Sequence, residues 1–348
     1  MHRLLGLFVL VFLLAACGDD TVSYSLLPVE EVFEQTGVTV NEKMDILWVI
    51  DNSGSMRSSQ ESVAVNFNKF IQRFSTKGYD FRIAVTTTSA YLDLYSKDPT
   101  QSRFRDGTDQ TSHSGVFVIT PETPNLTNVF MTNIIQGTLG SGDERGLQSL
   151  RSTLTNPLNS GFLRDDSFLA IIFVTDEEDF SHDSATYSEN MSIMHPVKDY
   201  IDFLDQLTKT SAENRRYSAS TVGIFDADCK TQLDKADPQK WYGRRITQRY
   251  AELTDATEGF KGSLCSDFGS TLDGIAQQIV RLSTQFFLSR QPVLETIRVF
   301  IDEQEIPQSA TNGWNYVAER NSIMFSGAAT PAQGQKVRID CDPATIVF

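Results

Sequence analysis

Two long apolar runs constrain the fold of this chain more than any other feature of its sequence. Residues 44–50 read MDILWVI and residues 168–175 read FLAIIFVT. Runs that are apolar at almost every position are typical of strands buried on both faces of a parallel sheet. Because parallel strands are joined by helical crossovers, these runs predict an α/β protein.

The segments around these runs alternate between strand and helix patterns. Further strands are predicted at residues 81–87, 115–120 and 217–225. Helices are predicted where apolar residues recur at helical spacing, namely Phe67, Phe70, Ile71 and Phe74 before a closing Gly78; Leu147, Leu150 and Leu154; Val197, Ile201, Leu204 and Leu207; and Leu272, Ile275, Ile279 and Leu282 in a helix from a capping box at 270–273 through Phe286. The alternation predicts a doubly wound, mostly parallel sheet over residues 44–290.

The pattern changes around Pro292. Short strand-like runs separated by Gly, Pro and Asn follow at 293–301, 314–317, 322–325 and 336–341, with no helical period between them. We interpret residues 291–348 as a small all-β domain. The alternative, a β-extension of the main sheet, is disfavoured because the preceding helix has the pattern of a last element of an α/β unit.

The first seventeen residues have the pattern of an export signal. A basic start is followed by an apolar run at 4–14 that is too short to span a bilayer comfortably, and then by Leu-Ala-Ala-Cys ending at Cys17. These four residues resemble the bacterial lipoprotein processing box, which implies cleavage before Cys17 and lipid attachment to its thiol. An ordinary secretory peptide is the alternative.

Residues 18–43 are polar and mixed, and they predict a tether that ends in an extended approach to the sheet. In Gram-negative lipoproteins, which this start resembles, an aspartate directly after the cysteine favours the inner membrane. Gly18 stands at that place here. We therefore expect a lipid-anchored envelope protein on the outer membrane of a Gram-negative bacterium.

Three cysteines remain once Cys17 carries lipid. Cys229 and Cys265 both lie in polar surroundings typical of loops, so we pair them in a disulfide and leave Cys341 as a thiol. The alternative is three reduced cysteines. A structural zinc site is not predicted, because the sequence has neither a CxxC spacing nor a histidine beside these residues.

A polar motif follows each of the two strongest strands. Residues 51–55 read DNSGS directly after the first, and Asp176 follows the second. In doubly wound sheets ligands bind at the carboxyl ends of the strands, so the two aspartates are expected to share one crevice. The D-x-S-x-S spacing lets one carboxylate and two hydroxyl groups converge, and Mg²⁺ prefers such oxygen ligands. The sequence therefore predicts a divalent-cation site formed by Asp51, Ser53, Ser55 and Asp176.

These residues are similar to the metal-ion-dependent adhesion site of von Willebrand factor type A (VWA) domains, and the resemblance covers residues 45–286. It implies that Ser53 and Ser55 bind the metal directly and that Asp51 and Asp176 act mainly through water. It also implies a threonine from a middle loop, where this chain departs from the family. Counting back from the glycine at 146 puts Ser141 at that place, with Thr138 as the fallback.

The resemblance further implies Mg²⁺, or Mn²⁺ or Ca²⁺, with an open position that accepts a carboxylate from a partner. We therefore expect binding of a protein or glycan ligand through the cation. An envelope scaffold or assembly factor with a purely structural metal is the main alternative. A subunit of a metal-inserting machine is a third, although a lipid anchor speaks against a cytoplasmic machine.

Several other functions are disfavoured. A formal net charge of -15 argues against a nucleic-acid or anionic-membrane surface. The sequence has no GxSxG elbow, no GxxxxGK[ST] loop and no GxGxxG after the first strand, so an enzyme is not predicted. We interpret the acids at 177–179 as a solvated loop or a helix start rather than a second ion site.

Overall fold

A computed structural model describes residues 33–34, 38–40, 42–236 and 243–344 of the chain. The predicted signal peptide, Cys17 and most of the predicted tether lie outside these residues. No helix in the described part combines the length and the apolar character needed to cross a membrane.

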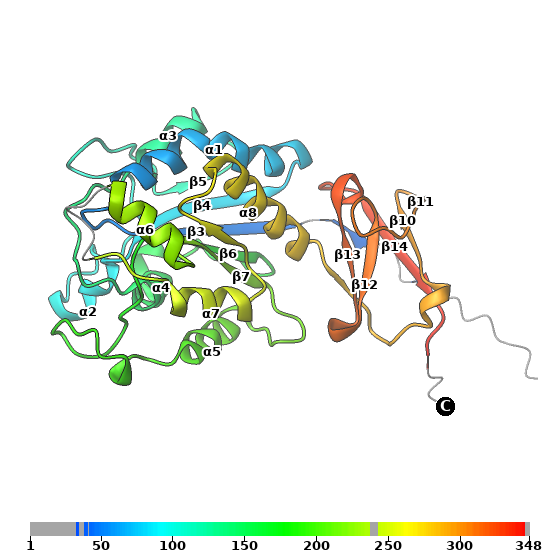
Figure 1. Cartoon of the computed structure of the whole chain (residues 1–348). Coiled ribbons are helices and arrows are strands. Elements are labelled where there is room, and N and C mark those ends of the chain that lie inside the picture. The colour runs from blue at the N-terminus through cyan, green and yellow to red at the C-terminus, as the bar shows by residue number, and fades with distance from the viewer. Residues whose placement is uncertain (1–32, 35–37, 41, 237–242, 345–348) are drawn as a thin grey trace, which may run out of the picture. The chain divides into compact units, whose positions relative to one another are not determined.

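The main sheet has six strands in the order β5-β4-β3-β6-β7-β8 (Figure 1). Neighbouring strands run parallel except for β4 and β5, which are antiparallel. The strands are β3 (Lys43–Ile50), β4 (Asp80–Thr87), β5 (Val118–Ile119), β6 (Phe168–Val174), β7 (Tyr217–Gly223) and β8 (Lys261–Ser263). The predicted α/β fold with a mostly parallel sheet is confirmed, although the run at 115–120 contributes only a two-residue edge strand.

Helices cover both faces of this sheet. Alternate residues of β3 enter two separate cores: Ile46 and Trp48 pack with α1, α3 and α8, whereas Leu47 and Val49 pack with α4, α5 and α7. Figure 1 shows these two layers of helices above and below the strands. The helices are α1 (Arg57–Lys77), α2 (Asp93–Ser96), α3 (Leu126–Ile134), α4 (Gly146–Thr155), α5 (Val197–Thr208), α6 (Ala227–Ala236), α7 (Gln248–Ala256) and α8 (Phe268–Ser283).

The last helix differs from its prediction at both ends. Helix α8 begins one turn before the predicted capping box, because the side chain of Asp267 accepts the Ser270 N–H at 2.8 Å and caps the helix there. It ends at Ser283, and Phe286–Phe287 forms β9, which pairs with β13. Phe286 is therefore a strand residue rather than the last residue of α8.

The C-terminal part contains two antiparallel sheets. One has the order β1-β14-β10-β11, with β2 also paired to β14, and the other has the order β12-β13-β9. The strands are β1 (Phe33–Glu34), β2 (Val38–Thr39), β10 (Arg298–Ile301), β11 (Gln304–Ile306), β12 (Trp314–Val317), β13 (Ser322–Phe325) and β14 (Lys336–Cys341). The predicted tether thus includes two strands, which are too short to leave a pattern in the sequence. The division of the chain near residue 290 stays a prediction.

The strand order defines where a ligand would bind. Counted along the chain, the six strands of the main sheet lie in the order third, second, first, fourth, fifth, sixth. The direction of the connections reverses between β3 and β6, and sheets of this kind bind ligands at the carboxyl ends of the strands beside such a reversal. The Asp51 N–H donates to the Val174 carbonyl oxygen at 3.0 Å, so the two loops begin side by side.

Candidate metal site

Asp51 is fully buried at the end of β3 and is held by hydrogen bonds. Its Oδ1 accepts the Ser53 N–H at 2.8 Å, and its Oδ2 accepts the Thr175 hydroxyl at 2.8 Å. Burial raises the pKa of Asp51, and the hydrogen bonds from Ser53 and Thr175 oppose that rise. The carboxylate is therefore fixed in position before any ligand binds.

The other three predicted residues of the site lie next to one another. The Oγ atoms of Ser53 and Ser55 are 3.3 Å apart, and the Ser55 hydroxyl donates to Asp176 Oδ1 at 2.9 Å. Asp176 Oδ2 accepts a hydrogen bond from Nε of Arg244 at 3.2 Å. Burial and the charge of Asp51 raise the pKa of Asp176 to about 7, against the effects of Ser55 and Arg244. The structure thus brings together hydroxyl and carboxylate oxygens from two loops.

The middle loop is connected to this group through side chains. Asn52 Oδ1 accepts the Ser89 hydroxyl at 2.9 Å, and Ser89 Oγ accepts the Ser141 N–H at 2.9 Å. The Ser141 hydroxyl contacts the Tyr91 hydroxyl at 3.1 Å and accepts the Asp143 N–H at 3.0 Å. The middle loop is therefore connected to Asn52 of the DNSGS motif, but the Ser141 hydroxyl is engaged by Tyr91 and by its own loop.

Neither Ser141 nor Thr138 makes a hydrogen bond to Asp51, Ser53, Ser55 or Asp176 in the part of the chain that the structure describes. For Thr138 the contact found is between its N–H and Gln110 Oε1, at 3.4 Å. The middle-loop ligand stays a prediction.

Glu144, in the middle loop after Ser141, is a buried acid that the sequence analysis did not single out. Its side chain is fully buried, and neither carboxylate oxygen has a hydrogen-bond partner among the described residues. Burial raises its pKa well above the usual range, the charges of Asp51 and Glu177 raise it further, and the nearby Thr88 hydroxyl opposes this rise. An acid just before a helix start is common, so its burial left no signal in the sequence.

The acids at 177–179 are not a solvated loop, because all three are buried. The Glu178 carboxylate accepts the Gln248 N–H at 2.8 Å and the Arg249 N–H at 3.1 Å, which caps α7. Asp179 accepts the Leu147 N–H at 2.9 Å at the start of α4 and Nε of Arg249 at 3.1 Å. Glu178 and Asp179 therefore do cap helix N-termini, but these are the N-termini of α7 and α4 rather than that of a helix formed by their own segment.

Glu177 is a further buried carboxyl group that interacts electrostatically with Asp51 and Asp176. Burial and the charges of Asp51 and Asp176 raise its pKa to about 9, while Arg245 lowers it. Carboxyl groups are therefore crowded at the carboxyl ends of these strands, and their mutual repulsion raises their pKa values in the absence of a cation. A divalent cation would relieve this repulsion, so the residues fit such an ion.

Within the described ranges, no three His, Cys, Asp or Glu side chains form a group that could hold a metal ion. The predicted ligand set is of a different kind, because it combines two aspartates with serine hydroxyls. Mg²⁺ is commonly held by one or two carboxylates and retains several waters, so such a set is chemically adequate.

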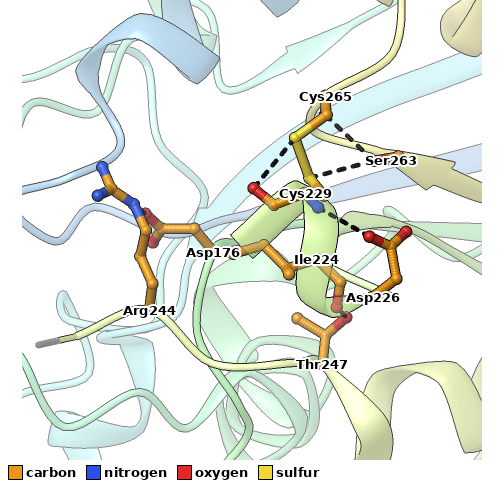
Figure 2. The surroundings of a disulfide bond; sticks show 8 residues. All are labelled: Asp176, Ile224, Asp226, Cys229, Arg244, Thr247, Ser263 and Cys265. Atoms are coloured by element: carbon orange, nitrogen blue, oxygen red, sulfur yellow. Dashed lines mark hydrogen bonds and ion pairs between the residues drawn. A yellow bond between two sulfur atoms is a disulfide. The ribbon is translucent and has the colours of Figure 1, made fainter. Parts of the chain in front are cut away.

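A disulfide lies at the same edge of the sheet (Figure 2). Cys229 in α6 is bonded to Cys265, which follows β8, and Cys341 is a free thiol. The predicted pairing is therefore present. Figure 2 also shows Arg244 beside Asp176, on the segment that continues to Thr247, whose hydroxyl donates to the Ile224 carbonyl oxygen at 2.9 Å. This segment connects the α6 side of the edge to the predicted metal site.

No protein-family model matches the chain. No curated protein matches it. Among solved structures, two crystal structures of the pilus adhesin SpaC from Lactobacillus rhamnosus GG align with 86% of this chain at 12% identity, with TM-scores of 0.42 and 0.40. The chain spans only 38% and 39% of these two structures. Proximal thread matrix protein 1 from the mussel byssus aligns with 74% of this chain over 51% of its own length, at 12% identity and a TM-score of 0.37. Similarities this low do not assign a function.

Proposed function

We propose that this chain is a VWA-type envelope lipoprotein that binds a protein or glycan partner through a divalent cation held at Asp51, Ser53, Ser55 and Asp176. The observation that carries the proposal is the meeting of these four side chains where the strand order reverses. The DNSGS motif and its resemblance to the VWA metal site support the same reading. We further propose that the protein binds its partner and does not catalyse a reaction.

Each of the four residues has a distinct part in this proposal. The Ser53 and Ser55 hydroxyls, 3.3 Å apart, would contact the ion directly. Asp176 would orient Ser55, to which it is already hydrogen-bonded, and Asp51 would supply buried negative charge. The bound ion would supply a positive centre with an open position for a carboxylate of the partner.

Calorimetric titration of the wild type with Mg²⁺, Mn²⁺ and Ca²⁺ tests the cation site. We expect Asp51→Ala and Asp176→Ala to abolish binding while the fold persists, because both aspartates lie in loops at the strand ends rather than in the apolar core. The matched control is Asp165→Ala, since the Asp165 side chain is 96% exposed and precedes β6 at the opposite edge. Equal affinity of the wild type and Asp51→Ala for all three ions would contradict the proposal.

Capture of a partner from an envelope extract, with and without chelator, separates the two function classes. Capture that disappears with chelator and in Asp51→Ala supports cation-dependent recognition. Capture that is unchanged by both favours the alternative of an envelope scaffold or assembly factor.

The proposed lipid anchor is tested separately, since Cys17 lies outside the described residues. We expect Cys17→Ser to release the protein from the membrane fraction, because one thiol would carry the whole anchor. Membrane association of Cys17→Ser that resists high salt would contradict this.

A further inference from the structure

Glu144 differs from every other fully buried acid in the described part of the chain. Asp45, Asp51 and Asp179 are equally buried, and each accepts two or more hydrogen bonds. Both oxygens of Glu144 lack a partner. An isolated buried carboxylate is costly, so this residue requires a physical explanation.

Other unpartnered oxygens lie near Glu144. The Thr88 hydroxyl, which follows β4, and the Tyr250 hydroxyl of α7 are buried without a hydrogen-bond partner among the described residues. The Thr88 hydroxyl nevertheless lies close enough to Glu144 to lower its pKa as a hydrogen-bond donor, and Tyr250 and Asp51 interact with Glu144 electrostatically. The Cβ of an alanine at Gly146 would come within 2.2 Å of the Tyr250 hydroxyl, so the start of α4 lies directly against that group. Oxygen-bearing groups from three elements thus surround one place.

The nearby positive charges are directed elsewhere. The Arg145 guanidinium donates to Asp143 at 2.6 Å and to the His182 carbonyl oxygen at 2.9 Å, and Arg244 donates to Asp176. In the described ranges no lysine or arginine forms an ion pair with Glu144. Within the described residues, no ion pair therefore stabilises the ionised form of Glu144.

We infer that Glu144, rather than Ser141, is the cation ligand from the middle loop. The inference rests on the proposed function, because it concerns the same ion. A cation near Asp51 would neutralise Glu144 and occupy its unpartnered oxygens. Ser141 would then be a positioning residue, which connects the loop to Asn52 through Ser89. With Asp51 and Asp176 acting mainly through water, Glu144 would be the direct carboxylate ligand beside the Ser53 and Ser55 hydroxyls, and the affinity for the ion would depend more strongly on charge.

The test compares Glu144→Gln with Ser141→Ala, and Glu122→Gln serves as a matched control because Glu122 is exposed in the loop after β5. The readouts are calorimetric titration with Mn²⁺ and thermal unfolding in chelator. We expect Glu144→Gln to weaken Mn²⁺ binding on the order of 100-fold. Ser141→Ala and Glu122→Gln should bind like the wild type. In chelator, Glu144→Gln should unfold at a higher temperature than the wild type, because it removes an unpaired buried acid.

Failure of this inference can be distinguished from failure of the proposed function. Should Glu144→Gln bind Mn²⁺ like the wild type while Asp51→Ala does not, Glu144 is no ligand and the proposed function stands. Loss of binding in Ser141→Ala alone would return the role to Ser141. Failure of the wild type to bind Mn²⁺ would contradict both the proposed function and this inference.

Glu144→Asp provides a second variant should Glu144→Gln fail to fold, because it keeps the charge and shortens the side chain by one methylene group. A folded Glu144→Asp protein with weakened Mn²⁺ binding supports the inference. Wild-type affinity in that variant would overturn it.

Discussion

Buried acids at the two ends of the strands in the main sheet have different surroundings. At the amino edge, Asp45 of β3 is fully buried and accepts two hydrogen bonds from Arg164, from its N–H at 2.7 Å and from Nε at 2.9 Å. At the carboxyl edge, Glu144 is equally buried and accepts none in the described chain. Burial alone therefore does not reveal function, because the paired acid stabilises the fold. The unpaired acid indicates where a positive ligand is expected.

The largest predicted change in stability concerns the covalent bond at the carboxyl edge. The Cys229–Cys265 disulfide joins residues 36 apart in the sequence. Replacing both cysteines with serine should lower the free energy of unfolding by ~4 kcal/mol on the loop-entropy model. Denaturant titration measures the loss, and mapping of disulfide-linked peptides checks the pairing. Finding Cys341 in the bridge would contradict the structure.

The next largest effect is predicted at the amino edge. Asp45→Ala removes a buried partner of Arg164, whose side chain is 13% exposed. We expect a loss of ~3 kcal/mol, at the low end for a broken buried pair, because Arg164 keeps its ion pair with Asp80. Denaturant titration of Asp45→Ala against Glu144→Gln sharpens the comparison, since the latter should lose no stability in chelator. Similar losses in both would mean that the two acids play the same part.

The stability of the metal-free protein should depend on pH, because several buried carboxyl groups lie close together at the carboxyl edge. The folded-state pKa of Glu177 is raised to about 9, mainly by burial and by Asp51 and Asp176, with Glu189 also raising it and Arg245 opposing. The folded state holds the Glu177 proton more tightly than the unfolded state does. The protonated carboxyl group therefore contributes to the stability of the folded state at low pH, and this contribution is lost as the pH rises toward 9.

Unfolding in chelator should therefore become easier between pH 5 and pH 9, by at most ~1.4 kcal/mol per pH unit for each proton involved. Glu177→Gln should flatten this dependence, and the exposed control Glu122→Gln should not. A wild-type profile that rises over this range would contradict the prediction.

The smallest effect is predicted for Ser141→Ala. The change removes the hydroxyl that contacts Tyr91 and accepts the Asp143 N–H. We expect the free energy of unfolding to fall by ~1 kcal/mol, typical of such hydrogen bonds. A loss above ~3 kcal/mol, measured by denaturant titration, would show that Ser141 does more than hold its loop.

The sequence by itself determined the features that depend on neighbouring residues. The apolar runs predicted β3 and β6, and helical spacing predicted α1 up to Gly78, which closes the helix with a φ of 70°. Strand and helix periods are local, so the α/β class could be read directly from them. The DNSGS motif after the first strand placed Asp51, Ser53 and Ser55 within one tight loop for the same reason.

Only the tertiary structure decided which acids have partners. Glu178 accepts an N–H from a helix that begins 70 residues further along the chain, and Asp179 accepts the N–H of Leu147, 32 residues before it, at the start of another helix. No local pattern distinguishes these two acids from Glu144, which the fold buries without a partner. The physical reason is that the cost of a buried charge depends on the groups packed around it, and packing brings those groups from distant parts of the sequence.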